Sequence, residues 1–387
     1  MKRKKEKILV CMSGGVDSSV AAALLVEQGY DVTGAYMINY DSKDDGQFTG
    51  PGSTTLRPVN KSCWVPDYRD AVRVAAKLGI PLLKLNFVKE YRQTVLKYMY
   101  DEYKKGRTPN PDVMCNRWVK FGFWLKKARE LGFDKIATGH YTKVVESRKG
   151  KVESYELLQA KDANKDQTYF LHQLNQGQLS HALFPLGKYT KDQVRRLAKK
   201  FDLPTANKEE SMGICFVGEV NMKDFLQKEI KTKPGKVVMS DGKVIGEHDG
   251  LAFYTIGERG LGLGSQKLEG EDNKPIYVVD KKYDINELVV GFEDDPLLFK
   301  NEIEVGDVNW IFGFVPEMPL KCEVRLRHRG QLQSAQVSKS NGQDKYLVKF
   351  EKKQRAITPG QFAVFYLDKK IFGFRKMKRC LGGGVIK

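Results

Sequence analysis

Residues 13–19, Ser-Gly-Gly-Val-Asp-Ser-Ser, have the types and the order needed to bind a phosphate group. An apolar run at residues 8–12 precedes them and an Ala- and Leu-rich helical pattern follows, which predicts a strand, a tight loop and a helix N-terminus. Gly14 and Gly15 let the backbone turn sharply and bring its N–H groups close to an anion. The helix dipole favours negative charge at the same point, and the polar residues that follow are helix-capping types.

This phosphate-binding loop lacks the Gly-Lys-Ser/Thr of a Walker A motif and the G-x-G-x-x-G spacing of a dinucleotide site. Its Ser-Gly-Gly-x-Asp-Ser pattern resembles the pyrophosphate loop of enzymes that split ATP into AMP and pyrophosphate and thereby adenylate a substrate. The alternative is a strand-to-helix turn without a ligand, which six matched positions in the right context disfavour. The loop therefore predicts cleavage of ATP at its α-phosphate.

A second stretch whose residue types could take part in a reaction is residues 108–116, Thr-Pro-Asn-Pro-Asp-Val-Met-Cys-Asn. Its two prolines predict an extended turn that presents Asn110, Asp112 and Cys115 together, ahead of a helix that carries Lys120. A helix N-terminus and a nearby cation lower the pKa of a thiol and favour the reactive thiolate. A buried, structural cysteine is the alternative.

Cys215 lies in a turn of small residues within residues 209–218, between the first half of the chain and a β-rich second half. A domain junction suits a site that closes over a substrate, although a structural cysteine is an equal alternative. Two isolated cysteines, Cys115 and Cys215, invite the hypothesis that they meet in space. The sequence by itself leaves their separation, and hence a disulfide, open.

Two further stretches are weaker candidates for ligand contact. Residues 138–141, Thr-Gly-His-Tyr, end a predicted strand, where His140 could contact a ligand or be structural. Residues 165–167, Lys-Asp-Gln, precede an apolar run. The alternative for them is a helix N-terminus with Asp166 in its first turn.

The first two hundred residues alternate strand and helix patterns, which predicts an α/β fold with a parallel sheet covered by helices. The predicted strands are at residues 8–12, 32–37, 81–85 and 135–138, and the predicted helices at 18–28, 67–78 and 121–131. Ligands of such sheets bind at the carboxyl ends of the strands, where the phosphate-binding loop lies. Residues 41–61, rich in Gly, Ser, Thr, Asp and Pro, predict a surface loop.

Beyond residue 222 short strand patterns are separated by Gly, Asp and Asn turns, which predicts a small β-rich module followed by a barrel or sandwich. These strand patterns are at residues 236–239, 243–245 and 276–279, and then at 321–327, 335–337, 346–350 and 361–366. The expected domains are a catalytic domain at residues 1–221, a small β-rich domain at 222–291 and a C-terminal β-barrel at 292–387.

The composition excludes several classes of protein. With 387 residues, 41% hydrophobic and 29% charged, the chain has the composition of a globular protein, and it has no apolar run long enough to span a membrane. The basic N-terminus is followed by only five apolar residues, which is not a signal peptide. Six scattered cysteines without a C-x-x-C pair disfavour a disulfide framework or a zinc ribbon and favour reduced cytoplasmic thiols.

The net charge of +18 is unevenly distributed. Residues 321–387 contain 17 Lys and Arg against 4 Asp and Glu, an excess of 13. Such a concentration is typical of a surface that binds a polyanion, most simply a nucleic acid. A merely soluble basic surface is the alternative, and charge alone does not separate RNA from DNA or an anionic membrane.

Together these stretches resemble the tRNA-specific 2-thiouridylase family over nearly the whole chain. The markers are Ser13–Ser18, Met37, residues 110–112, Cys115, Gly139-His140, residues 165–167, 213–216, 254–257, 327–329, 358–361 and 381–384. Their order and spacing are specific, although each one alone is weak. The sequence departs from the family at Glu210, where an aspartate is common, and at His328, where a tyrosine is common.

The resemblance implies a cytoplasmic ATP-pyrophosphatase, related to adenine nucleotide alpha hydrolases, that thiolates the wobble uridine of tRNAs for lysine, glutamate and glutamine. The base is first adenylated by ATP, with Mg²⁺ expected. The phosphates would bind on Cys11, Met12, Ser13, Gly14, Gly15, Val16, Asp17 and Ser18, with the adenosine near Met37 and Gly139.

The resemblance also implies a source and a path for the sulfur. A sulfur-relay protein or a cysteine desulfurase would load a persulfide onto Cys215, and Cys115 would release the sulfur, leaving a Cys115–Cys215 disulfide. Asp112 would be the general acid/base. The implied contacts to the target base and the tRNA are Asn110, Pro111, Asp112, His140, Lys165, Asp166, Gln167, Arg327, His328 and Gln361.

Two rival functions explain fewer of these residues. Another ATP-pyrophosphatase, an amidotransferase or a ligase acting on a small acid, leaves both cysteines and the basic C-terminus without a task. An RNA-binding protein with an inert nucleotide loop leaves the intact loop unexplained. Release of pyrophosphate that depends on tRNA distinguishes the thiolation hypothesis from both.

Overall fold

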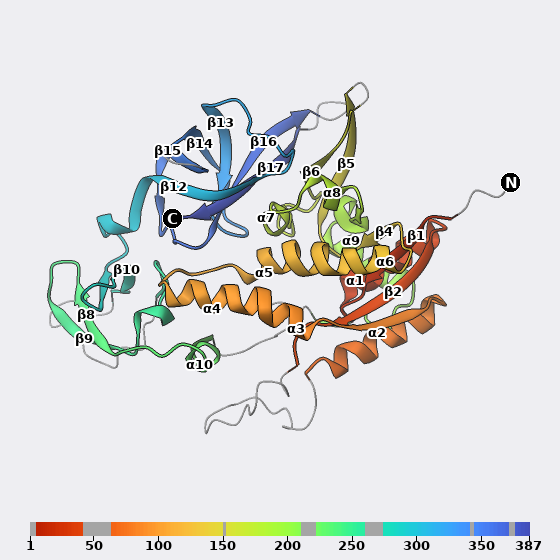
Figure 1. Cartoon of the computed structure of the whole chain (residues 1–387), viewed down its shortest axis with the longest axis horizontal. Helices are drawn as coiled ribbons and strands as arrows, with labels where there is room; N and C mark the ends of the chain where they lie inside the picture. Colours follow the sequence, from red (N-terminus) through yellow and green to blue (C-terminus); the bar gives the residue numbers. More distant parts are fainter. Residues whose placement is uncertain are drawn as a thin grey trace.

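The computed structural model describes residues 5–41, 63–149, 152–209, 222–259, 274–340, 344–370 and 376–387. Figure 1 shows a sheet flanked by helices, a small β-rich part and a barrel. This arrangement confirms the predicted α/β class with a parallel sheet first and a barrel last. Most of the loop predicted at residues 41–61 lies outside the described residues, as do Glu210 and Cys215.

The first sheet is parallel and carries the phosphate-binding loop at the end of a central strand. Its described strands run in the order β3-β2-β1-β4-β7. Since β1 is paired with β2 on one side and β4 on the other, the strand order reverses at β1, which is where ligands bind in open α/β sheets. The strands are β1 (Lys7–Cys11), β2 (Asp31–Ile38), β3 (Leu82–Asn86), β4 (Lys135–Ala137) and β7 (Ala182–Leu183).

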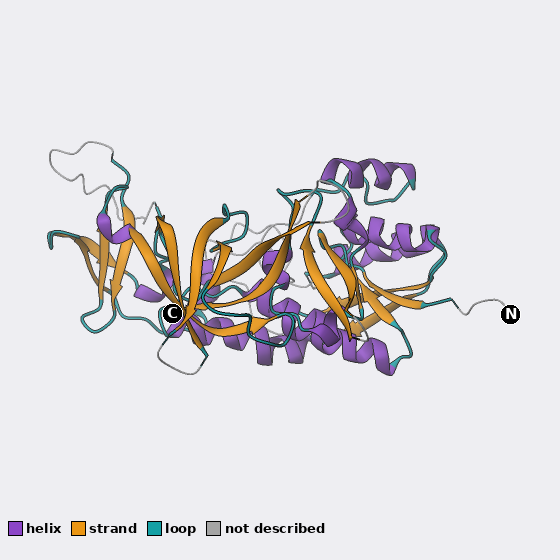
Figure 2. Cartoon of the chain, turned by 90° about the horizontal axis from the view of Figure 1, so that it is seen from above, coloured by secondary structure: helices purple, strands orange, loops and turns teal. Residues whose placement is uncertain are grey.

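Helices cover both faces of this sheet (Figure 2). Ile8 and Val10 of β1 belong to one hydrophobic core, with α1, α2 and α9, whereas Leu9 and Cys11 belong to a second core with the helices from α3 to α6. Successive side chains of a strand point to opposite faces, so a strand between two helical layers is apolar throughout. The helices are α1 (Val16–Glu27), α2 (Val65–Leu78), α3 (Val88–Tyr91), η2 (Arg92–Leu96), α4 (Lys97–Lys104), α5 (Pro111–Met114), η3 (Cys115–Trp124), α6 (Leu125–Glu130) and α9 (Lys191–Lys200).

The helix that carries Cys115 begins ten residues earlier than the sequence predicts, because α5, η3 and α6 are continuous. Pro111 occupies the first helical position, where its missing N–H costs no hydrogen bond. Asn110 caps the helix by accepting a hydrogen bond from the Val113 N–H at 3.4 Å. The predicted extended turn is therefore wrong beyond Asn110, and Cys115 lies inside a helix.

The small β-rich part is a four-stranded described sheet in the order β10-β11-β8-β9. The β11–β8 pair is parallel and the other two pairs are antiparallel. Its core includes Val237, Val278 and Leu288. The elements are α10 (Met222–Gln227), β8 (Gly235–Met239), β9 (Val244–His248), η5 (Leu251–Phe253), β10 (Tyr277–Lys282) and β11 (Glu287–Gly291).

Six of the described strands close into the C-terminal barrel, because β12 pairs with both β15 and β17. They are β12 (Phe299–Trp310), β13 (Leu320–Arg325), β14 (Gln333–Lys339), β15 (Lys345–Arg355), β16 (Phe362–Lys370) and β17 (Lys376–Ile386). The hairpin of β5 (Thr142–Lys149) and β6 (Val152–Gln159) extends this sheet, since Leu157 and Leu158 pair with β17. The barrel sheet thus includes residues from the first half of the chain.

The glycine run in β17 lies where the barrel closes and where it contacts the first part of the chain. A Cβ on Gly382 would lie 1.9 Å from the carbonyl oxygen of Asn309, and one on Gly383 would lie 2.9 Å from the His172 ring. Gln173 donates a hydrogen bond to the Gly383 carbonyl at 2.9 Å. Glycine is therefore required for this close packing of backbones. The helices next to it are α7 (Thr168–Leu171) and α8 (Gln176–Leu179).

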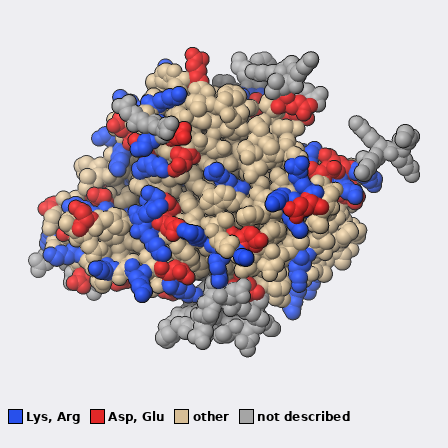
Figure 3. Space-filling model, viewed as in Figure 1, with Lys and Arg blue, Asp and Glu red and all other residues tan. Residues whose placement is uncertain are grey.

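The basic surface contains many ion pairs. Lys345, Lys378 and Arg379 of the barrel pair with glutamates, and blue and red side chains are interspersed in Figure 3. On β15, a row of exposed basic residues includes Lys349 and Lys352, with the exposed Glu351 between them. Within the described residues, no helix is both long and apolar enough to cross a bilayer.

Candidate active site

The phosphate-binding loop follows β1 directly and leads into α1. Gly14 has φ +75°, and a Cβ there would lie 2.2 Å from the carbonyl oxygen of Asp67. Gly15, in an extended conformation, is the N-cap of α1 and provides no side-chain acceptor for the N–H groups of the first turn. The loop therefore leaves backbone donors at a helix N-terminus available to an anion, which fits the phosphates of a nucleotide.

Two serines stabilise the loop from within. The Ser13 N–H donates to Oγ of Ser18 at 3.2 Å, and the hydroxyls of Ser18 and Ser19 donate to the Gly15 carbonyl at 3.1 and 2.8 Å. These bonds fix the loop conformation before any ligand binds, so that little ordering is needed on binding.

Asp17 is held by two residues that sequence reasoning missed as site residues. The Tyr141 hydroxyl donates to Oδ1 of Asp17 at 2.8 Å, and Nζ of Lys191 lies 2.8 and 2.9 Å from its two carboxylate oxygens. Lys191 is the first residue of α9, which Thr190 caps with Gln193. The Thr-x-x-Gln pattern predicts that a helix starts here, but it does not predict that Lys191 contacts Asp17 in the first turn of another helix, α1.

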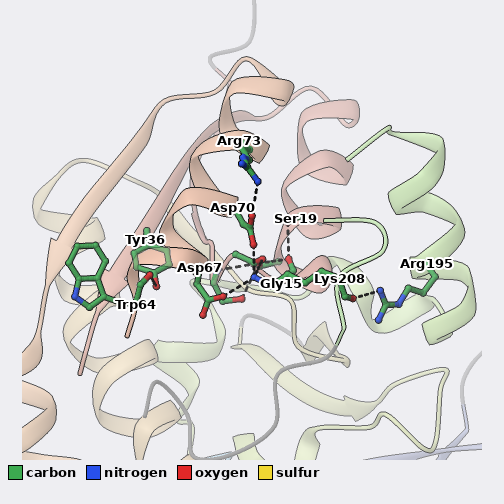
Figure 4. Close-up of polar contacts among 12 residues, drawn as sticks. Gly15, Ser19, Tyr36, Trp64, Asp67, Asp70, Arg73, Arg195 and Lys208 are labelled. Carbon is green, nitrogen blue, oxygen red and sulfur yellow. Dashed lines mark hydrogen bonds and ion pairs between the residues drawn. The ribbon is translucent and has the colours of Figure 1, made fainter. Parts of the chain in front are cut away.

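Lys208 is a third missed residue, and it contacts the other side of the loop (Figure 4). Its ammonium donates to Oδ1 of Asp67 at 2.7 Å, to Oδ2 of Asp70 at 2.6 Å and to the Gly14 carbonyl at 3.1 Å. The carboxylates lie on one face of α2, three residues apart. No local pattern in the sequence marks this lysine.

The structure brings Gly139 to the loop and places Met37 in the interior nearby. A Cβ on Gly139 would lie 2.8 Å from the backbone nitrogen of Ser18, because β4 is the neighbour of β1. Met37, in the other neighbouring strand β2, is 3% exposed. The close approach of Gly139 explains why the position lacks a side chain.

His140 is buried behind the loop. It packs between the rings of Phe121 and Phe184, both at 6.2 Å between centroids, and its Nδ1 lies 2.7 Å from Oγ1 of Thr138. Burial, and secondarily the positive charge of Lys120, holds the pKa of His140 well below its usual value. This histidine is therefore neutral at pH 7.

All three parts of the chain meet at residues 107–110, ahead of Cys115. Nε2 of Gln361 donates to the carbonyls of Thr108 and Pro109 at 2.9 and 3.1 Å, and its Oε1 accepts from Asn110 at 3.4 Å. The Thr108 hydroxyl lies 3.1 Å from the hydroxyl of Thr255 in the small β-rich part. Asn110 and Gln361, both predicted site residues, are thus brought together.

Of the predicted catalytic residues, Asp112 and Cys115 lie on this helix and Cys215 lies outside the described residues. Asp112 is partly buried in the first turn, and its carbonyl accepts from Nδ2 of Asn116 at 3.0 Å. Cys115 has no solvent-accessible surface. No disulfide joins two of the described cysteines, and no group of His, Cys, Asp and Glu in the described ranges is arranged to hold a metal ion.

Asp166 lies in the interior, not on a surface. Its carboxylate accepts from Arg325 at 2.9 Å, from the Thr168 hydroxyl at 2.7 Å and from the Ala160 N–H at 3.2 Å. Gln167, next in the chain, accepts a hydrogen bond from the Tyr141 N–H at 2.9 Å and is the N-cap of α7. A helix does start here, as the alternative predicted, but it begins at Thr168, so Asp166 precedes the N-cap and is not in the first turn.

The remaining predicted tRNA contacts lie at the barrel's side of the site. Arg327 is exposed and Lys165 is partly buried. His328 packs on the ring of Phe170 at 4.4 Å, and burial together with Arg329 lowers the pKa of His328 to about 4.

Three family models match consecutive stretches of the chain. By their descriptions they are a tRNA methyl transferase HUP domain over residues 6–219, a tRNA methyl transferase PRC-barrel domain over residues 223–292 and an aminomethyltransferase beta-barrel domain over residues 300–386. The matched stretches follow the parallel sheet, the small β-rich part and the barrel.

Curated relatives match the chain from end to end. The tRNA-specific 2-thiouridylase MnmA of Legionella pneumophila (strain Paris) is 44% identical over 386 residues, which are 99% of this chain and 99% of the relative. The protein of the same name from Shouchella clausii (strain KSM-K16) is 43% identical over 388 residues, 100% of this chain and 97% of the relative. A solved 4-thiouridine synthetase–RNA complex with bound ATP is 21% identical over 55% of this chain and 46% of that chain, with a TM-score of 0.33, which is too distant to inform the site.

Proposed function

Because this chain belongs to the tRNA-specific 2-thiouridylase family, we propose that it is a tRNA-uridine 2-sulfurtransferase. Its substrates are ATP and the wobble uridine of tRNAs for lysine, glutamate and glutamine. The observation that carries the proposal is the end-to-end match to these relatives, 44% over 386 residues. We also propose that the reaction takes place in the cytoplasm, where thiols are kept reduced.

In the proposal ATP, as its magnesium complex, binds at the loop and supplies an adenylyl group to the 2-oxo oxygen of the uridine, while pyrophosphate leaves. The phosphates contact the backbone from Cys11 to Ser18, supported by the donors at the start of α1. Met37, on β2, and Gly139, which follows the end of β4, border the adenosine. Lys191, which binds Asp17, and Lys208, which binds Asp67, are close enough to the loop to fix its conformation.

The sulfur step uses two cysteines. The outer sulfur of a persulfide on Cys215, loaded by a sulfur-relay protein or a cysteine desulfurase, attacks C2 of the base, and AMP leaves with the former 2-oxo oxygen. The Cys115 thiolate then attacks the Cys215 sulfur, which breaks the S–S bond and releases 2-thiouridine. Both cysteines are oxidised to a disulfide as the transferred sulfur is reduced, and a thiol reductant restores them.

Residues of the helix and the barrel position the RNA in this proposal. Asp112 exchanges the proton near the target base and Asn110 binds the flipped-out nucleotide, while Gln361 holds the segment in front of them. Arg327 and the exposed basic row on β15 bind the phosphate backbone, so affinity falls as salt rises. His140 and Asp166, which are buried, act by supporting the site.

The division of labour follows the three parts of the chain. We assign catalysis to residues 1–221, a linking role to residues 222–291 and tRNA binding to residues 292–387. The β5–β6 hairpin crosses this division, since it belongs to the first stretch and pairs with the barrel. Lys165, which follows that hairpin, is close enough to His328 of the barrel for its positive charge to help lower the pKa of the histidine.

The family descriptions name methyl transfer, whereas the curated relatives are named for thiolation. Methyl transfer to tRNA would release neither pyrophosphate nor AMP, and it would need no pair of cysteines. The anion site at the start of α1 therefore favours thiolation. The products of the reaction distinguish the two.

The test incubates the protein with ATP, a persulfide donor and tRNA, and measures pyrophosphate release together with the retarded migration of thiolated tRNA in a mercury-containing gel. We expect wild type to do both, and Cys215→Ser to release pyrophosphate without thiolating tRNA. Cys322→Ala, a buried cysteine in the barrel core, is the matched control and should retain both activities. Equal thiolation by wild type and Cys215→Ser would overturn the persulfide step, and a lack of tRNA-dependent pyrophosphate release would overturn the use of ATP.

A further inference from the structure

Lys208 joins three segments that are far apart in the sequence. Its side chain crosses from the end of the first part of the chain to α2 and to the loop, where all three N–H donors of the ammonium find acceptors: Asp67, Asp70 and the Gly14 carbonyl (Figure 4). Its own carbonyl accepts a hydrogen bond from Arg195 of α9 at 2.5 Å. Both ends of this residue are therefore held.

The charge around Lys208 argues against a direct role in holding phosphate. The Lys208 ammonium, whose side chain is about one quarter exposed, contacts two carboxylates, and Arg73 lies 3.5 Å from one of them, Asp70. The cluster as a whole carries no surplus positive charge to offer an anion. What remains is the contact to the Gly14 carbonyl, at 3.1 Å.

That contact fixes the orientation of one peptide group. In a trans peptide the C=O and the following N–H point in opposite directions, so the N–H of Gly15 points away from Lys208 and α2. Among the described residues nothing accepts a hydrogen bond from this N–H. A donor held in this way at a helix N-terminus is suited to an anion.

A peptide between two glycines is the easiest kind to turn over, because neither residue has a Cβ to restrict φ and ψ. If the Gly14–Gly15 peptide turned over, its carbonyl oxygen would face the bound phosphate in place of the N–H, and the two would repel. The contact from Lys208 opposes this rotation, and the two carboxylates of α2 keep the ammonium in place.

We propose that Lys208 is a positioning residue for the phosphate-binding loop: it holds the Gly14 carbonyl outward and thereby directs the Gly15 N–H at the pyrophosphate part of the nucleotide. This inference rests on the proposed use of ATP and adds a residue to it. Lys191 acts separately, since it binds Asp17 on the other side of the loop.

The test compares Lys208→Met, which keeps the chain length and removes the charge, with Lys200→Met, an exposed lysine of α9, as control. The ligands are pyrophosphate and a non-hydrolysable ATP analogue, measured by calorimetry, and adenosine, measured by ligand-observed NMR. We expect Lys208→Met to weaken pyrophosphate and the analogue by roughly 10- to 100-fold, the size of one hydrogen bond to a charged group. Adenosine affinity should change by less than about twofold, and the control should match wild type.

A second measurement follows the Gly15 amide itself, in protein labelled with ¹⁵N-glycine. In wild type, pyrophosphate should move this resonance downfield, and the movement should be smaller in Lys208→Met. Asp70→Asn, which leaves Asp67 to hold the lysine, should show an intermediate effect.

Three results would overturn the proposal. One is wild-type affinity for pyrophosphate in Lys208→Met, and another is an equal loss of adenosine and pyrophosphate binding together with a lowered melting temperature. The third is an unchanged Gly15 resonance in a variant that binds pyrophosphate weakly. If wild type itself binds neither pyrophosphate nor the ATP analogue, the proposed function fails at its first step and this inference fails with it.

Discussion

Arg325 of β13 donates a hydrogen bond from Nη1 to Oδ2 of Asp166 at 2.9 Å, across the contact between the barrel and the first part of the chain. The aspartate side chain has no exposed surface and that of the arginine is 9% exposed. Arg325 also lies over the ring of Tyr366, with 5.2 Å between the guanidinium carbon and the ring centroid. The pair thus orients α7 and the segment containing Gln167 against the barrel.

We predict that Arg325→Met destabilises the protein by about 3–5 kcal/mol, because it leaves a buried carboxylate without its counter-charge. Urea unfolding followed by tryptophan fluorescence measures the loss. The double variant Arg325→Met/Asp166→Asn should regain much of it, since no unpaired charge remains. A single variant as stable as wild type would show that Asp166 finds another partner.

Gly14 and Gly29 offer a matched test of the loop. Both have positive φ, +75° and +84°, but only Gly14 has a close neighbour, since a Cβ added there would lie 2.2 Å from the Asp67 carbonyl oxygen. Gly29→Ala should cost about 1 kcal/mol of stability from backbone strain and leave binding of an ATP analogue intact. Gly14→Ala should weaken that binding at least about tenfold, because the loop must move away from α2. Calorimetry and thermal unfolding separate the effects, and equal binding by the two variants would contradict this prediction.

Much of the loop and its surroundings could be predicted from the sequence because the signals are local. A strand, two glycines and a helix start within twelve residues specify a strand–loop–helix unit, and the structure shows β1, Gly14-Gly15 and α1 there. The alternation of strands and helices likewise predicted the parallel sheet. The interpretation of Pro111 as a sign of an extended turn is wrong. Proline breaks a helix only in its interior and is favoured at the first helical position, which is where Pro111 lies.

The partners of the loop could not be predicted in this way. Lys191 and Lys208 contact Asp17 and Gly14 from 174 and 194 residues away, and no sequence pattern links either lysine to the loop. The burial of Asp166 could not be predicted for a related reason. A charged residue ahead of an apolar run is equally compatible with an exposed contact and with a buried ion pair, and the deciding partner, Arg325, is 159 residues away.

Gln361 should matter for the RNA step and not for ATP. Its amide donates to the Thr108 and Pro109 carbonyls, so Gln361→Glu places a carboxylate against two carbonyl oxygens and should push the segment before Asn110 out of place. We expect thiolation to slow by roughly tenfold or more, with unchanged binding of an ATP analogue. Gln227→Glu, at an exposed position of α10 in the small β-rich part, is the control and should match wild type. A loss of ATP binding in Gln361→Glu would indicate a wider disturbance.

His172 makes stability depend on pH in a specified direction. Burial, opposed in part by the hydrogen bond from its Nδ1 to the Tyr169 carbonyl, lowers the pKa of His172 from 6.5 to about 4, and Arg117 lowers it further. Its Nε2 is buried without a hydrogen-bond partner in the described structure, so a proton there would have no acceptor. The unfolded chain therefore takes up this proton first as pH falls.

The contribution of His172 is thus fully present above pH 6.5 and is lost progressively as pH falls toward 4, by about 1.4 kcal/mol per pH unit and about 3 kcal/mol in all. His172→Gln keeps a donor for the Tyr169 carbonyl but cannot titrate. Urea midpoints measured at pH 7, 6 and 5 should therefore fall less steeply for His172→Gln than for wild type. The slope does not vanish, because burial also lowers the pKa values of His140 and His328. If the urea midpoints of the two proteins fell equally steeply with pH, folded His172 would take up its proton at the same pH as in the unfolded chain, and its pKa would not be lowered.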